Sequence, residues 1–194
     1  PTAGEARIFD VPVDPDDKRL ASRIGFSSAQ FDFLDYLTGR EILIAQASLH
    51  GVPRAEVLER VTDLLSLFDL ENAAEHHVYE YSQGMRQKLG LAAALVYSPD
   101  VLLLDEPFDG LDATAVYRLI ETLRSMASRG KTILLTSHDL SLVERVCDRV
   151  GVLHEGRIQR ELDVATSPAA AETSLESAMW KIVGTPNYNE LSWL

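Results

Sequence analysis

The 194-residue sequence has a single cysteine, Cys147, so neither an internal disulfide nor a cysteine-based zinc cluster can form. A long apolar run is also missing: the longest, residues 89–97, is half of the roughly 18 residues that a bilayer requires. Basic residues are scarce, 18 against 30 acidic ones, for a formal net charge of −12. This balance argues against a binder of duplex DNA or RNA, which needs a basic face, but allows a small basic nucleotide pocket. A reducing, cytoplasmic setting fits these absences.

The residues that are present have the balance of a globular protein, with 46% apolar and 25% charged side chains. Two short apolar runs, 101–104 and 132–136, predict buried parallel strands, and the amphipathic segment 113–128 between them predicts a helix. Other expected elements are a mostly helical stretch 31–78, a helix 140–148, a strand 150–153 and a hairpin return 157–159. This alternation of strands and helices predicts an α/β fold with a mainly parallel sheet.

An acidic pair gives the clearest chemical signal. The apolar run from Val101 ends in Asp105 and Glu106, at the strand end where α/β sheets bind their ligands. One carboxylate at such a position can hold Mg²⁺, and its neighbour can orient or deprotonate a water molecule. A strand that ends in a solvated acidic turn is the alternative, and the pair alone does not decide between them.

A second signal lies in residues 81–88. Ser82 is a good cap for a helix that runs to Val96, and Gly84 leaves backbone amides of the first turn bare. Such amides, together with the positive end of the helix dipole, make a phosphate-binding site. An ordinary capped helix remains the alternative.

Two further polar residues come after strands. His138 directly follows the 132–136 run, where it could contact a terminal phosphate or hold a carboxylate in place. Gln30 follows a short strand expected at 23–26 and precedes the helical stretch. Neither is informative alone. A lone histidine more often lies at the surface, and a single glutamine after a strand has no specific meaning.

In this order the motifs resemble those of the nucleotide-binding domain of ABC transporters. Gln30 matches the Q-loop, 81–88 the signature motif, 101–106 the Walker B strand, 108–112 the D-loop and His138 the switch histidine. The resemblance covers nearly the whole chain and implies a P-loop NTPase (RecA-like) core, with a mainly parallel sheet, plus a helical subdomain. The Tyr-Ser-x-Gly-Met form of the signature is similar to that of bacterial exporters of drugs, sodium or lipids. Phe108-Asp109 and Ala113 depart from the usual residues of the D-loop region.

The resemblance also divides the chain. It implies a remnant of the N-terminal β-subdomain with the Q-loop (1–30), a helical subdomain (31–80), a catalytic α/β core (81–163) and a C-terminal linker and helix (164–194). Several apolar residues just after the Q-loop either line a groove for a membrane subunit or form the core of the small lobe: Phe31, Phe33, Leu34, Tyr36 and Leu37.

The P-loop of the family, Gly-x-x-x-x-Gly-Lys-Ser/Thr, does not occur in these 194 residues. The nearest match to the motif is Gly130-Lys131-Thr132, but Ser125 occupies the position of its first glycine. We therefore expect the N-terminal part of the domain, with its Walker A segment, to be truncated. Without that strand and helix the sheet would have unpaired amides and a bare apolar face. We expect the 194 residues alone to be unstable or rearranged and inactive.

In the family, two such domains sandwich two ATP molecules. The resemblance implies that Asp105 holds Mg²⁺, that Gln30 reaches the metal or the water, that Glu106 is the general base and that His138 contacts the γ-phosphate. Other residues would bind nucleotide at the dimer interface: Ser82, Gln83, Gly84, Met85 and Asp112.

The function implied is that of an ATP-binding subunit that couples ATP hydrolysis to export, peripheral to the cytoplasmic face of the membrane. Its partners would be a second ABC ATPase domain, of the same or another chain, and a membrane permease subunit, but no nucleic acid. The alternative is a catalytically silent ABC-like regulatory module that supplies its signature helix in trans. Glu106 and His138 favour a working enzyme, since a silent domain has no physical need for a base. A DNA-repair ABC ATPase is disfavoured by the acidity and the lack of a long coiled-coil insertion.

Overall fold

The computed structural model describes residues 3–14, 17–28, 35–164 and 175–184. Their contacts divide the chain into two compact units, Pro1–Ser137 and His138–Leu194. Within the described ranges, no helix combines the length and the apolar character needed to cross a membrane.

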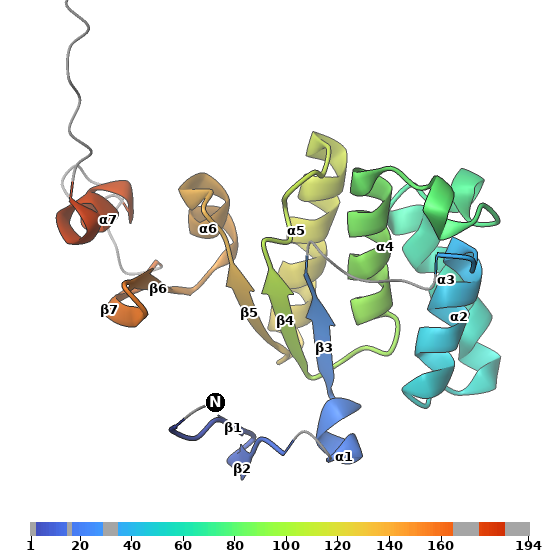
Figure 1. Cartoon of the computed structure of the whole chain (residues 1–194), viewed down its shortest axis with the longest axis horizontal. Helices are drawn as coiled ribbons and strands as arrows, with labels where there is room; N and C mark the ends of the chain where they lie inside the picture. The colour runs from blue at the N-terminus through green and yellow to red at the C-terminus, as the bar shows by residue number, and fades with distance from the viewer. Residues whose placement is uncertain (1–2, 15–16, 29–34, 165–174, 185–194) are drawn as a thin grey trace, which may run out of the picture. The chain divides into compact units, whose positions relative to one another are not determined.

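A three-stranded parallel sheet is the centre of the first unit. Its strands are β3 (Ile24–Ser27), β4 (Val101–Asp105) and β5 (Thr132–Thr136), in the order β3-β4-β5 (Figure 1). The register sets Phe26 beside Leu103 and Leu103 beside Leu134. The predicted parallel sheet and both apolar strands are therefore confirmed.

The two apolar runs differ in burial. Both were predicted to be buried, and for the second run, 132–136, that prediction is wrong. Leu102 and Leu104 of β4 are buried, as expected for a central strand. Every residue of β5 is partly or fully exposed, and Leu134 is 64% exposed. Phe26 on β3 is 52% exposed in the same row across the sheet. The reason is position, because β5 and β3 pair with β4 alone among the described strands.

Helix α5 (Ala113–Ser128) has the bounds that its amphipathic pattern predicts. Its buried side chains include Leu119, Ile120 and Leu123, spaced to fall on one helical face. The helix lies behind the sheet in Figure 1 and contacts β5. Gly130 follows it with a φ of 83°, the left-handed conformation that glycine adopts without strain at a helix end.

Helix α4 (Gln83–Leu95) lies between the sheet and the helices α2 (Gly39–Leu49) and α3 (Arg54–Leu67) (Figure 1). It is buried along most of its length, and its contact with β3 is close. A Cβ on Gly25 would lie 2.7 Å from the carbonyl oxygen of Ala94. Only a residue without a side chain allows this approach of strand to helix.

The helical layer between residues 35 and 81 has its own core. Helix α2 begins with a capping box, in which the Thr38 hydroxyl accepts from the Glu41 N–H and the Glu41 carboxylate accepts from the Thr38 N–H. Two short 3-10 helices, η1 (Glu71–Ala73) and η2 (Val78–Glu80), follow α3. The largest fully buried side chains of this layer are Leu43, Val61, Leu65, Phe68, Leu70 and Val78.

The start of the first unit is small. Strands β1 (Arg7–Ile8) and β2 (Val11–Pro12) pair antiparallel, and α1 (Lys18–Ala21) follows. Asp17 caps α1 by accepting from the N–H groups of Arg19 and Leu20. This short helix places Arg23 directly before β3.

The second unit consists of α6 (Leu140–Val146), β6 (Arg149–His154), β7 (Arg157–Asp163) and α7 (Leu175–Val183). Strands β6 and β7 form an antiparallel hairpin around Glu155 and Gly156, both with positive φ. This confirms the predicted strand 150–153 and its hairpin return at 157–159.

Candidate functional site

Three strand-end residues, Asp105, Glu106 and Thr136, meet at the carboxyl end of the sheet. Asp105 is the last residue of β4 and is directly opposite Thr136, the last residue of β5. The Thr136 hydroxyl donates to Asp105 Oδ1 at 2.6 Å and accepts from the Glu106 N–H at 3.1 Å. The acidic pair is thus held by one hydroxyl from the neighbouring strand, which the sequence alone did not single out.

The loop 106–112 then runs from β4 to the start of α5. Its first residue, Glu106, has a φ of 47°, a left-handed conformation that is uncommon for a residue with a side chain. The Glu106 carbonyl accepts from the Asp109 N–H at 3.2 Å. The loop therefore turns sharply at the second acid.

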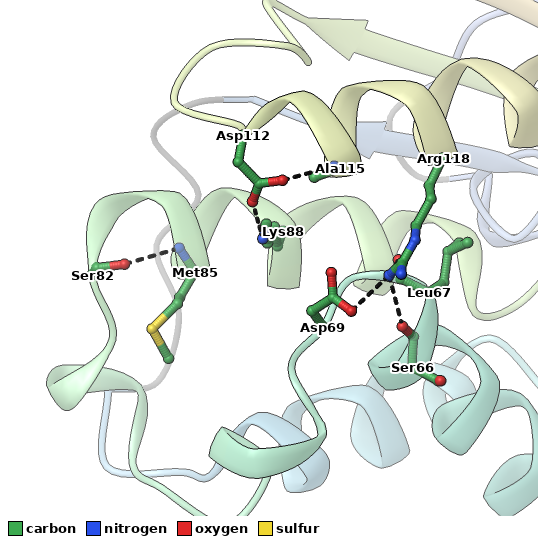
Figure 2. Close-up of polar contacts among 9 residues, drawn as sticks. All are labelled: Ser66, Leu67, Asp69, Ser82, Met85, Lys88, Asp112, Ala115 and Arg118. Atoms are coloured by element: carbon green, nitrogen blue, oxygen red, sulfur yellow. Dashed lines mark hydrogen bonds and ion pairs between the residues drawn. The ribbon is translucent and has the colours of Figure 1, made fainter.

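The N-terminus of α4 has the predicted cap. Ser82 Oγ accepts from the Met85 N–H at 3.2 Å, as Figure 2 shows. Ser82 and Gln83 are exposed, and Gly84 and Met85 are partly exposed. Because the first N–H groups of any α-helix have no partner within the helix, this end can offer donors to an anion.

Gly84 has a second role that the sequence did not reveal. A Cβ at this position would lie 2.8 Å from the carbonyl oxygen of Gly110 in the loop 106–112. A rigid backbone atom at that distance leaves no room for a side chain. The glycine therefore brings α4 against the loop, besides exposing amides.

One turn further along α4, Lys88 makes a second contact with this loop. Its Nζ lies 2.6 Å from Asp112 Oδ2, and Asp112 Oδ1 accepts from the Ala115 N–H at 2.9 Å (Figure 2). The Lys88 ammonium, and then the N–H of Ala115, lower the pKa of Asp112 to about 2. Asp112 thus caps α5 and ties it to α4 at the same time.

Arg118, two turns along α5, contacts the end of α3. Its Nη1 lies 2.7 Å from Asp69 Oδ1 and donates to the carbonyl groups of Ser66 (3.3 Å) and Leu67 (3.0 Å), as Figure 2 shows. These carbonyls belong to the last turn of a helix, where a cation is favourable. The pairing joins residues 49 apart in the chain. Lys88 and Arg118 were both missed, because no local pattern indicates such a partner.

A cavity of about 230 Å³ lies elsewhere, along β3, with His50 and Tyr97 among its lining residues. These two rings stack at 3.7 Å, and the Tyr97 hydroxyl donates to the Ile24 carbonyl at 3.0 Å. Burial raises the pKa of Tyr97 to about 12. None of the predicted site residues that the structure describes lines this cavity.

Two predicted site residues, Gln30 and His138, stay predictions. Gln30 lies outside the described residues, as do the neighbouring Phe31, Phe33 and Leu34. His138 is exposed and begins the second unit, so its proximity to Glu106 stays a prediction. Tyr36 is 67% exposed, which is compatible with the predicted groove and not with a core position.

The donors that are present fit a magnesium nucleotide. Asp105 is exposed and keeps carboxylate lone pairs beyond the one that accepts from Thr136, and Mg²⁺ prefers such oxygen ligands. The N-terminus of α4 supplies amides suited to phosphate. The two sets are joined through the loop 106–112 by contacts at Gly84 and Lys88.

Comparison with known proteins identifies the domain. Residues 4–144 match a family model described as "AAA domain, putative AbiEii toxin, Type IV TA system". An uncharacterized ABC transporter ATP-binding protein of Nostoc sp. is 36% identical over 160 residues, covering 81% of this chain and 47% of the relative. Nod factor export ATP-binding protein I of Burkholderia thailandensis is 44% identical over 158 residues, covering 81% and 52%. The chain spans about half the length of these curated relatives.

Two solved structures agree with the family and the fold. An ATP-binding subunit of an ABC transporter has a TM-score of 0.71 at 31% identity, over 76% of this chain and 62% of that one. A dimeric ATP-binding cassette in a post-hydrolysis state, bound to ADP and Pi, has a TM-score of 0.75 at 26% identity, over 84% and 75%. The chain therefore belongs to the family of this AAA-domain model and to the nucleotide-binding domains of ABC transporters, with their α/β P-loop NTPase fold.

Proposed function

We propose that, in the full-length protein, this domain binds and hydrolyses ATP within a dimer of two such domains and thereby powers export across a membrane. The observation that carries the proposal is the acidic strand end, where Asp105 and Glu106 are fixed beside Thr136. The carboxyl end of a parallel sheet is where α/β proteins bind their ligands. The family, and a structural neighbour bound to ADP and Pi, support ATP as that ligand.

Asp105 is the proposed ligand of Mg²⁺, with Gln30 as a second group that reaches the metal or the attacking water. A bound Mg²⁺ supplies charge neutralisation for the β- and γ-phosphates. The Thr136 hydroxyl donates to one oxygen of Asp105 and so orients its carboxylate. His138, at the start of the second unit, is proposed to contact the γ-phosphate.

Glu106 is the proposed general base. It would accept a hydrogen bond from the water that attacks the γ-phosphate and remove its proton as the bond forms. Its side chain starts from a backbone that is already turned away from β4. Catalysis of this kind depends on positioning and on charge stabilisation, and not on a covalent intermediate.

The N-terminus of α4 is proposed to act on the nucleotide held by the partner domain. Ser82, Gln83, Gly84 and Met85 would offer hydroxyl and amide donors to its phosphates, in the field of the helix dipole. Asp112 is proposed to contribute to the same interface. Its pairing with Lys88 keeps the loop 106–112 and α4 together, so that both present one surface.

The proposed membrane partner is a permease subunit, which places the protein at the cytoplasmic face of the membrane. Two of the relatives described above are transporter or export ATP-binding proteins, which supports this assignment. Exposed Tyr36, near the predicted Q-loop, is a candidate contact with that subunit. The signature of the exporter type, Tyr81 to Met85, favours export over import.

The test is ATP hydrolysis by the full-length protein and its Glu106→Gln variant. We expect the wild type to turn over ATP, and the variant to lose turnover while accumulating as an ATP-bound dimer on size-exclusion chromatography. The dimer should accumulate because the amide keeps the size of the carboxylate but cannot take a proton. Full turnover by the variant would refute Glu106 as the base. A folded wild type that binds ATP without any hydrolysis would instead indicate a silent regulatory module.

A further inference from the structure

Glu106 has a strained backbone at the point where chemistry is proposed. Its φ of 47° lies in the left-handed region, which costs free energy for any residue with a Cβ. Such a conformation persists only where the surrounding structure holds it. The groups that hold it are therefore candidates for residues that position the base.

Hydrogen bonds hold both peptide groups of Glu106. Its N–H donates to the Thr136 hydroxyl at 3.1 Å. Its carbonyl accepts from the Asp109 N–H at 3.2 Å and from Gln87 Nε2 at 3.5 Å. Gln87 lies on α4 and is only 6% exposed, so this amide comes from the interior. The turn at Glu106 is thus fixed by β5 on one side and by α4 on the other.

The Thr136 hydroxyl has two partners. It has one proton, which it gives to Asp105 Oδ1 at 2.6 Å, and it accepts the Glu106 N–H with a lone pair. The β4–β5 register, which sets Asp105 opposite Thr136, brings the hydroxyl to this position. A short bond to a carboxylate oxygen is the stronger kind of hydrogen bond.

We propose that Thr136 is a positioning residue for the reaction: one hydroxyl sets both the carboxylate of Asp105 and the backbone of Glu106, with Gln87 as a second support from α4. The role rests on the proposed function, since Asp105 and Glu106 are the metal ligand and the base assigned there. The hydroxyl acts by keeping the two acids at a fixed angle to each other.

The decisive variants are Thr136→Val, which keeps the shape and removes the hydroxyl, and Thr136→Ser, which keeps the hydroxyl. Thr132→Val is the matched control, because Thr132 lies on the same strand, is exposed and pairs with Val101 at the other end of the sheet. The first readout is amide hydrogen exchange of Glu106 in the full-length protein, followed by NMR with ¹⁵N-labelled glutamate. It requires neither nucleotide nor activity.

We expect Thr136→Val to speed exchange of the Glu106 amide by about tenfold or more, because its acceptor is gone. Thr136→Ser and Thr132→Val should exchange at the wild-type rate. In ATP hydrolysis, Thr136→Val should lower kcat by about tenfold to a hundredfold with KM for ATP changed by less than about threefold. Thr136→Ser should recover most of kcat.

The outcomes separate this inference from the proposed function. Wild-type exchange at Glu106 in Thr136→Val overturns the inference, whatever the activity. Faster exchange with an unchanged kcat, in an active protein, also overturns it, since the hydroxyl would then be structural only. A wild type that never hydrolyses ATP refutes the proposed function, while exchange at Glu106 still decides whether Thr136 holds its backbone. If Thr136→Val does not fold, Thr136→Ala removes the same hydroxyl with less bulk and is judged by the same criteria.

Discussion

The two ends of the three-stranded sheet are built from different chemistry. At the amino end, Asp100 pairs with Arg23 (Nε to Oδ2, 2.7 Å) and with Lys131 (Nζ to Oδ1, 2.8 Å). Lys131 also donates to the Ser98 carbonyl at 3.2 Å. At the carboxyl end, Asp105 and Glu106 leave β4 together and are held by a neutral hydroxyl.

The proposed function assigns a different role to each end. At the amino end, hydrogen bonds from Lys131 and then Arg23 lower the pKa of Asp100, so the carboxylate there is stabilised by cations of its own chain. At the carboxyl end, two adjacent acids offer the oxygen ligands that Mg²⁺ prefers. On the proposed function, the amino end is a structural clamp and the carboxyl end binds the ligand.

The largest expected effect on stability comes from replacing a glycine by alanine near each end of the sheet. Gly84→Ala would place a Cβ 2.8 Å from the Gly110 carbonyl oxygen, and α4 or the loop 106–112 must shift. We expect a loss of about 2–3 kcal/mol in the free energy of unfolding, the cost of overpacking a tight contact. Amide exchange in the loop 106–112 should rise as well.

Gly130→Ala is the matched variant at the amino end. Its Cβ would meet open space, so the only cost is the left-handed φ of 83°, about 1 kcal/mol. Urea unfolding of both variants measures the difference. Equal losses, with the loop 106–112 unaffected in Gly84→Ala, would show that α4 does not depend on its contact with the loop.

A smaller effect separates the two roles of Asp112. Asp112→Asn keeps a good helix cap and loses the ion pair with Lys88, for about 0.5 kcal/mol, since this carboxylate is half exposed. Asp112→Ala should lose about 1 kcal/mol more, because the cap of α5 disappears. Thermal unfolding at neutral pH checks both values.

The stabilisation by the ion pair of Asp112 and Lys88 should depend on pH in a direction that the pKa of Asp112 fixes. The folded pKa of Asp112, about 2, is below its ordinary value of 3.8, so its stabilising effect is complete above that ordinary value. It is lost as pH falls from about 4 towards 2. The difference between the wild type and Asp112→Asn should therefore shrink across this range. A difference that stays constant there would contradict the ion pair.

Much of the fold could be predicted from local pattern. The helix 113–128, the strand ending at Asp105 and the helix capped by Ser82 are specified by apolar spacing and by caps that act within a few residues. Burial could not be predicted in the same way. The runs 101–104 and 132–136 each contain at least three consecutive apolar residues, but among the described strands the first is central and the second is paired on one side only. Strand order, which the run itself does not contain, decides that difference.

The two acidic residues of the candidate site could be predicted from the sequence. The residues that hold them and the neighbouring loop in place could not. Asp105 and Glu106 follow from a strand end, whereas Thr136, Gln87 and Lys88 act through partners 19 to 31 residues away. A threonine at the end of an apolar run carries no distinct signal until the register places it opposite an aspartate. The proximity of His138 to this site stays a prediction.

The central claim is that the carboxyl end of the sheet is the reaction site and the amino end a structural clamp. One paired measurement tests it most directly. Turnover of ATP and the free energy of unfolding are measured for Asp105→Asn and Lys131→Met in the full-length protein. We expect Asp105→Asn to lower kcat by about a hundredfold or more without loss of stability. Lys131→Met should lose about 1 kcal/mol of stability and keep kcat within about twofold. An Asp105→Asn protein with normal turnover, or a folded Lys131→Met protein without turnover, would contradict the account.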